Sequence, residues 1–161
     1  MRVIIILLFI LFSGLGYGSE SFKSIVFKDA VIVIPAKWNF KEKENCLLIR
    51  KDIVQSASYL KICRETSSVE SDYFTMNDDK VWEAITDGVP ILADVNVTKE
   101  FTGMSAIVSC KYKDDAGYHT DKCFQAEIDL PTHINFIFSG RGDPSLFKDY
   151  KESYLSFKIK Q

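Results

Sequence analysis

The chain has 161 residues, of which 20 are basic and 22 acidic, and its formal net charge is −2 at pH 7. Because no excess of positive charge is present, neither nucleic acid nor an anionic membrane surface is an expected partner. Hydrophobic residues make up 47% of the chain, whereas glycine and proline number only 8 and 4, a composition that indicates a globular domain rather than a disordered one.

The first 18 residues have the three-part layout of a secretory signal peptide. Arg2 supplies the positive charge, residues 3–12 form the apolar centre, and Gly16 and Gly18 stand at the positions that a signal peptidase reads. The apolar run is shorter than the about 20 residues of a transmembrane helix, so an N-terminal anchor is the weaker alternative. We expect cleavage after Gly18 and a single mature domain over residues 19–161. It would be periplasmic or, alternatively, extracellular, with no stable membrane anchor.

Hydrophobic patterning predicts seven β-strands in the mature chain. The strand over residues 123–130 alternates cleanly, with apolar side chains on one face and Gln125, Glu127 and Asp129 on the other. We expect the apolar face to pack on a core and the polar face to lie in solvent. The other predicted strands are, in chain order, residues 24–35, 46–49, 59–63, 91–99, 105–112 and 134–138.

Two helices are predicted. The first begins at Asn77, whose side chain can cap it, and ends before Pro90. The second begins at Asp143, with Pro144 at its first position, and aromatic residues recur at helical spacing as far as Phe157. The fold class that follows is α+β, an antiparallel sheet covered by two main helices.

Four cysteines remain after cleavage: Cys46, Cys63, Cys110 and Cys123. An even number in an exported chain indicates disulfides, and four cysteines allow three connectivities. The spacing favours Cys46 with Cys63 and Cys110 with Cys123, because each pair is placed symmetrically about a turn. The alternatives are free thiols or a metal site, but a zinc site would need Cys-x-x-Cys pairs or histidines at ligand spacing, which the sequence lacks. We therefore expect two disulfides, no metal and no cofactor.

Three short segments carry a family resemblance. Residues 34–38 read Ile-Pro-Ala-Lys-Trp, residues 134–140 form an apolar strand before the last helix, and residues 154–159 contain Ser-Phe-Lys. Together they resemble the strand-Pro-x-x-Trp start and the Ser-Phe-Lys close of the PsbP-like superfamily, which includes Ran-binding Mog-type and DcrB-like envelope proteins. The resemblance implies an α/β/α sandwich used mostly for protein binding, without catalysis. Some type VI secretion immunity proteins, which block cell-wall-degrading effectors in the periplasm, are similar in this layout.

Residues that could support catalysis are few. His119 and His133 are the two histidines, and no serine stands in a Gly-x-Ser-x-Gly context. Glu127 and Asp129 would lie about 7 Å apart on one strand face, from a rise of about 3.4 Å per residue. Two carboxylates that face each other over a cleft could cleave a glycoside, but this spacing occurs on any solvent-facing strand. The sequence therefore favours a protein that is not an enzyme.

We interpret the protein as an exported, non-enzymatic protein-binding domain. Its most concrete form is a periplasmic immunity protein that neutralises a secreted effector directed at the cell wall. One alternative is a general envelope accessory or assembly factor of the same fold, and another is a small secreted hydrolase.

The predicted contact with the protein partner is the tip of a hairpin between the last two cysteines. Acidic and aromatic side chains on a loop held by a disulfide suit insertion into a basic cleft. A second aromatic pair precedes the first predicted helix, and it either anchors the partner or packs beneath its own loop as core. The tip residues are Asp114, Asp115, Tyr118 and His119, and the aromatic pair is Tyr73 and Phe74.

Overall fold

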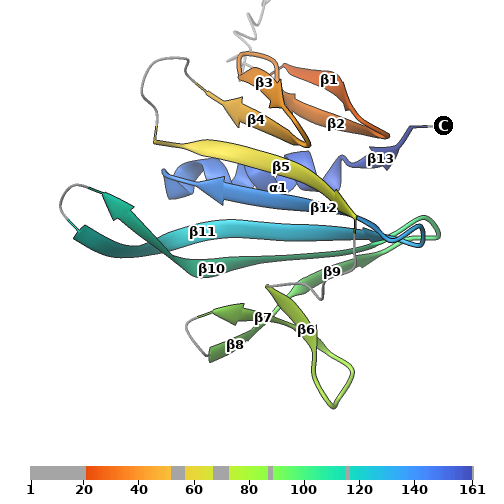
Figure 1. Ribbon diagram of the computed structural model, residues 1–161, viewed down its shortest axis with the longest axis vertical. Coiled ribbons are helices and arrows are strands. Elements are labelled where there is room, and N and C mark those ends of the chain that lie inside the picture. Colours follow the sequence, from red (N-terminus) through yellow and green to blue (C-terminus); the bar gives the residue numbers. More distant parts are fainter. Residues whose placement is uncertain (1–20, 52–56, 67–72, 87–88, 115–116, 161) are drawn as a thin grey trace, which may run out of the picture.

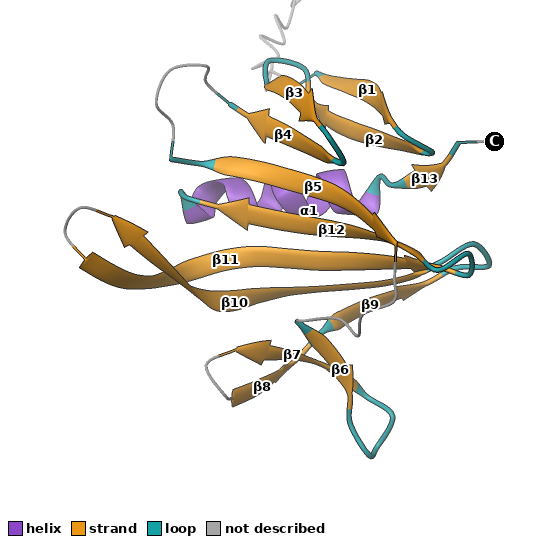
Figure 2. Cartoon of the chain, viewed as in Figure 1, coloured by secondary structure: helices purple, strands orange, loops and turns teal. Residues whose placement is uncertain are grey.

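The computed structural model describes residues 21–51, 57–66, 73–86, 89–114 and 117–160. These ranges hold thirteen β-strands in three antiparallel sheets, one α-helix and a short 3-10 turn (Figures 1 and 2). The expected α+β sandwich with two covering helices is therefore wrong, because the described chain is mostly β-structure and contains a single α-helix. The predicted signal peptide lies outside the described residues.

The largest sheet has seven strands and forms the centre of the molecule. Along β12, Phe136 and Phe138 are buried on one face, whereas Asn135, Ser139 and Arg141 alternate with them and project from the other. The sheet therefore has an apolar face and a mostly polar face. In spatial order its strands are β3 (Asn39–Lys43), β4 (Cys46–Arg50), β5 (Tyr59–Thr66), β12 (Ile134–Arg141), β11 (Gly117–Leu130), β10 (Thr102–Asp114) and β9 (Asp94–Val97).

A second layer covers the apolar face. It consists of α1 (Phe147–Leu155), the preceding 3-10 turn (Pro144–Leu146), and a three-stranded sheet of β1 (Phe22–Phe27), β2 (Ala30–Pro35) and β13 (Lys158–Ile159). In Figure 2 the helix runs behind β5 and β12.

The main core lies between these two layers, and aromatic rings dominate it. Tyr154 of α1 meets Phe138 edge to face, with ring centroids 5.6 Å apart, and Phe157 meets Phe136 at 5.0 Å. Such pairs contribute about 0.5–1.5 kcal/mol each beyond the burial of their area. Gly140 of β12 lies directly against the ring of Tyr150 on α1, so a side chain at this position would collide with that ring.

The start of α1 confirms the predicted second helix. Asp143 Oδ1 accepts a hydrogen bond from Ser145 N at 2.9 Å, and Pro144 occupies the first position of the turn that leads into the helix. Proline suits this position because its missing N–H would have no partner there.

A third sheet covers part of the polar face. It comprises β6 (Phe74–Met76), β7 (Trp82–Thr86) and β8 (Val89–Leu92), and Figure 1 shows it beside β10 and β9. Between it and the large sheet lies a second, smaller core of Phe74, Ala84, Met104, Val108 and Cys123.

The helix predicted from Asn77 is wrong, because this region forms the β6–β7 hairpin. Asn77 does use its side chain as a cap, but Oδ1 accepts a hydrogen bond from Val81 N at 3.0 Å and closes a tight turn. Lys80 completes that turn with a φ of 60°. The segment from Trp82 then alternates between inside and outside with the period of a strand, and Ala84 is buried against β10.

Three smaller expectations also need correction. The strand predicted over residues 24–35 is a hairpin, because Lys28 turns the chain with a φ of 54°. The strand predicted over residues 91–99 is divided at Ala93, whose N–H bonds to the Trp82 carbonyl oxygen. The polar side of β11 is not in solvent, because Gln125 and Glu127 are each only 2% exposed.

Both predicted disulfides are present. Cys46 and Cys63 stand directly opposite each other on β4 and β5, with Cα atoms 4.1 Å apart. Cys110 and Cys123 join β10 and β11 across a diagonal, with Cα atoms 5.9 Å apart. Two disulfides are compatible with an oxidising, exported location.

No helix in the described ranges is long and apolar enough to span a membrane.

Candidate functional site

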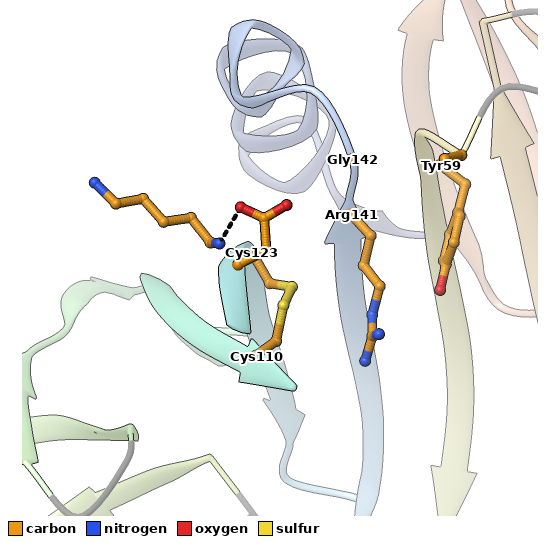
Figure 3. Close-up of a pocket in the computed structure, with 8 residues that line it drawn as sticks. Tyr59, Cys110, Cys123, Arg141 and Gly142 are labelled. Carbon is orange, nitrogen blue, oxygen red and sulfur yellow. Dashed lines mark hydrogen bonds between the residues drawn. A yellow bond between two sulfur atoms is a disulfide. The ribbon is translucent and has the colours of Figure 1, made fainter. Parts of the chain in front are cut away.

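A cavity of about 370 Å³ opens on the polar face of the large sheet. Tyr59 at the start of β5 stands opposite Arg141 at the end of β12, and both side chains belong to the polar face. Figure 3 shows these two side chains side by side on neighbouring strands, with the Cys110–Cys123 disulfide on the other side of Arg141. The strand register thus gathers an aromatic ring, a guanidinium and a disulfide around one hollow.

The backbone around Arg141 is held by three contacts. Tyr150 Oη donates to the Arg141 carbonyl oxygen at 3.1 Å, and Asp143 N donates to Ser58 Oγ at 2.9 Å. Gly142, between them, has a φ of 94° and lies so close to Ser58 that a side chain would collide with it. Only glycine adopts this conformation at low cost. The position of Arg141 is therefore set by the strand end, the helix and the β5 strand together.

The cavity carries one positive and one negative side chain. Within the described part of the chain, the Arg141 guanidinium has no hydrogen-bond or ion-pair partner. Asp121 lines the cavity too, and its Oδ1 accepts a hydrogen bond from Lys122 N at 2.7 Å. The Lys122 side chain itself lies on the face of β11 opposite Cys123, because successive residues of a strand point to opposite faces.

A row of buried polar groups lies farther along the same face. Asn135 Nδ2 donates to Glu127 Oε1 at 2.9 Å, and Ser139 Oγ donates to Gln125 Oε1 at 2.9 Å. Burial, together with the neighbouring Glu127 carboxyl, raises the pKa of Asp129 to about 6. The polar side of β11 therefore consists of a hydrogen-bonded network rather than a solvated strand face.

Glu127 and Asp129, the carboxyl pair considered for glycoside cleavage, belong to this network. Glu127 is only 2% exposed and accepts a hydrogen bond from Asn135 Nδ2, so its carboxyl group is buried rather than presented to an open cleft. Burial and the proximity of Glu127 together favour the protonated form of Asp129, as expected for two neighbouring carboxyl groups.

The predicted hairpin tip is only partly described. The backbone of Asp114 pairs with Gly117, and Tyr118 and His119 pair with the opposite strand as β10 and β11 continue outward. The side chains of Asp114, Tyr118 and His119, and the whole of Asp115, lie outside the described residues.

The aromatic pair before β7 belongs to the smaller core. Phe74 is 3% exposed, and Tyr73 packs against the same cluster while remaining partly buried. Of the two roles left open by the sequence, Phe74 has the core role.

Tyr59 and Arg141 were not identified by sequence reasoning. Arg141 follows a strongly apolar strand, and its place in the alternation puts it on the opposite face from Phe138. The alternation that places Arg141 is visible in the sequence. The position of Tyr59 beside it follows only from the pairing of β5 with β12, which connects segments far apart in the chain.

No protein-family model matches the chain, and no curated protein sequence matches it.

Proposed function

We propose that this protein is an exported protein-binding domain, most concretely a periplasmic immunity protein that occludes a secreted, cell-wall-targeting effector. The observation that carries the proposal is a set of exposed apolar residues on the consecutive strands β7, β8 and β9, called here the apolar strip: Ile85, Pro90, Leu92, Val95 and Val97.

The apolar strip is unusual in its exposure. Leu92 and Val97 are 73% and 70% exposed, and Ile85, which pairs with Pro90 across β7 and β8, is 49% exposed. Isolated apolar residues are normal on a protein surface, but a run of them over successive strands marks an interaction site. β9 is also an edge strand of the large sheet, so unpaired backbone groups adjoin the same strip.

Three other features agree with the proposal. The N-terminal segment has the layout of a signal peptide, and the two disulfides suit an oxidising compartment. The resemblance to PsbP-like proteins implies a binding role rather than catalysis. The β10–β11 hairpin tip, with its acidic and aromatic residues, is the second predicted contact with the partner.

The experiment uses the mature domain and the secreted hydrolase encoded beside its gene. We expect a stable complex by size-exclusion chromatography and protection of cells that receive the hydrolase in their periplasm. Leu92→Asp should weaken the complex by at least about tenfold, because a buried carboxylate in an apolar contact is costly.

The matched control is Val26→Asp on β1. Val26 is 58% exposed and belongs to the sheet on the opposite side of the large sheet, so this variant should bind and protect like the wild type. The proposal fails if the domain neither binds nor protects against any secreted hydrolase. Capture of a resident envelope protein in its place would favour an accessory factor.

A further inference from the structure

We propose that the cavity beside Arg141 is a receptor for a single carboxylate group attached to an apolar body. The inference stands independently of the proposed function, because it rests on the cavity and on the charges that line it rather than on the apolar strip of β7–β9.

Two arginines on the adjacent strands β5 and β12 differ in whether they have a carboxylate partner. Arg64 on β5 is paired within the chain, since its Nε and Nη2 donate to the two carboxylate oxygens of Asp29 at 2.9 and 3.2 Å. Arg141 on β12 has no such carboxylate in the described part of the chain. A guanidinium presents a planar fork of donors that matches a carboxylate, so Arg141 offers in the cavity the site that Asp29 fills for Arg64.

The charges of the lining favour a monoanion over a dianion. Arg141 contributes a positive charge and Asp121 a negative one, whereas the alternation of β11 places the Lys122 side chain on the face opposite Cys123. One carboxylate neutralises the Arg141 guanidinium, whereas a phosphate dianion would leave an excess negative charge close to Asp121.

The remaining walls suit an apolar group. Tyr59 contributes its ring, Ala57 its methyl group, and Cys110 and Cys123 their disulfide. A volume of about 370 Å³ is near the lower end of the 300–1,000 Å³ range of small-molecule sites. The cavity therefore fits a body the size of one amino acid rather than a large cofactor.

The site is also pre-organised. The Arg141 carbonyl oxygen is held by Tyr150 Oη, and Ser58 approaches Gly142 too closely for any larger residue. Because the backbone that carries the guanidinium is fixed before binding, little conformational entropy remains to be lost there.

The test measures binding of N-acetyl-L-phenylalanine to the oxidised mature domain by NMR titration, with N-acetyl-L-phenylalaninamide as the uncharged match. We expect the acid to bind at least about tenfold more tightly than the amide, the usual difference for a lost charge-assisted pair. The shifted resonances should be those of Tyr59, Arg141 and their neighbours.

Two substitutions are expected to change the affinity for the acid in opposite directions. Arg141→Gln should weaken binding of the acid by about tenfold, and Asp121→Asn should strengthen it, because the one negative charge in the lining is removed. Lys61→Gln on β5 is the control: Lys61 is exposed, does not line the cavity, and should leave binding unchanged. The Asp121 substitution, at an exposed position, keeps the test valid even if Arg141→Gln unfolds.

The source of the carboxylate is distinguished by a tetrapeptide that ends in phenylalanine. Tighter binding of the peptide than of the acetylated amino acid would identify a protein C-terminus as the ligand, whereas weaker binding would identify a free small acid. Equal affinity for acid and amide, tighter binding of inorganic phosphate, or no effect of Asp121→Asn would each overturn the proposal.

Discussion

Glu127 and Asp129 project from the same face of β11, and the Glu127 carboxyl group helps to raise the pKa of its neighbour. Glu127 is held by Asn135 Nδ2 at 2.9 Å, whereas Asp129 Oδ1 has no hydrogen-bond partner in the described chain. The two acids are thus unequally supported, and burial is the largest cause of the raised pKa of Asp129.

We expect the stability of the protein to fall as the pH rises through the pKa of Asp129. Its pKa is raised from 3.8 to about 6, so the folded state binds the proton more tightly than the unfolded state does. The stabilisation is fully present below about pH 4 and is lost above about pH 6. Asp129→Asn should therefore increase the free energy of unfolding at pH 8 by roughly 1 kcal/mol, a value discounted for partial solvent exposure.

Urea denaturation at pH 4 and pH 8 checks this expectation. At pH 4 the variant should gain nothing, because wild-type Asp129 is then neutral as well. Asp79→Asn, at an exposed turn position, is the control and should leave both profiles unchanged. A gain of equal size at both pH values would show that the pKa of Asp129 is not the cause.

Two tyrosines of α1 should respond oppositely to loss of their hydroxyl groups. Tyr150 Oη donates to the Arg141 carbonyl oxygen at 3.1 Å, whereas the buried Tyr154 Oη has no partner in the described chain. Tyr150→Phe should cost about 1 kcal/mol of unfolding free energy, and Tyr154→Phe should be neutral or stabilising. Thermal melting of the two variants side by side is sufficient, and equal destabilisation would contradict the expectation.

Gly142→Ala should destabilise the protein more than Gly117→Ala. Both glycines have a positive φ, 94° and 117°, so both substitutions strain the backbone. A side chain at Gly142 would also collide with Ser58, whereas one at Gly117 would meet nothing within 4 Å. We expect a loss of about 1 kcal/mol at Gly117 and at least about 2 kcal/mol at Gly142, measured by urea denaturation.

Each disulfide should contribute about 3 kcal/mol, since the bonded cysteines are separated by 17 and 13 residues. Replacement of either cysteine pair by alanines should lower the free energy of unfolding, measured by urea denaturation, by about 3 kcal/mol. Thiol titration of the unfolded wild type without reductant should find no free thiol. Four reactive thiols in protein purified under native conditions would contradict the paired state.

The elements that the sequence predicted well are those governed by local rules. Asp143 and Pro144 start a helix by capping chemistry alone, and the turn between Cys110 and Cys123 closes a hairpin whose partners are near in the chain. The two-helix fold failed at Asn77, because capping of a turn and capping of a helix use the same side chain. Only the packing of Ala84 against β10 decides between them.

The candidate site was beyond sequence reasoning for a different reason. Tyr59 and Arg141 meet through a strand pairing that no local pattern reveals. Burial of Glu127 likewise cannot be read from β11 itself, because the alternation of that strand alone indicates a face in solvent. Long-range pairing and the coverage of one layer by another are properties of the assembled fold.

The small sheet of β1, β2 and β13 joins parts of the chain that are synthesised far apart. Val33 N bonds to Ser156 Oγ at 2.8 Å across 123 residues, and Lys158 pairs with Val31. A polypeptide that is synthesised stepwise therefore keeps this edge of β2 uncovered until β13 has been made. This edge is therefore the strand edge that a chaperone can bind for the longest time during synthesis. A truncated chain that lacks β13 would leave it exposed to aggregation and proteolysis.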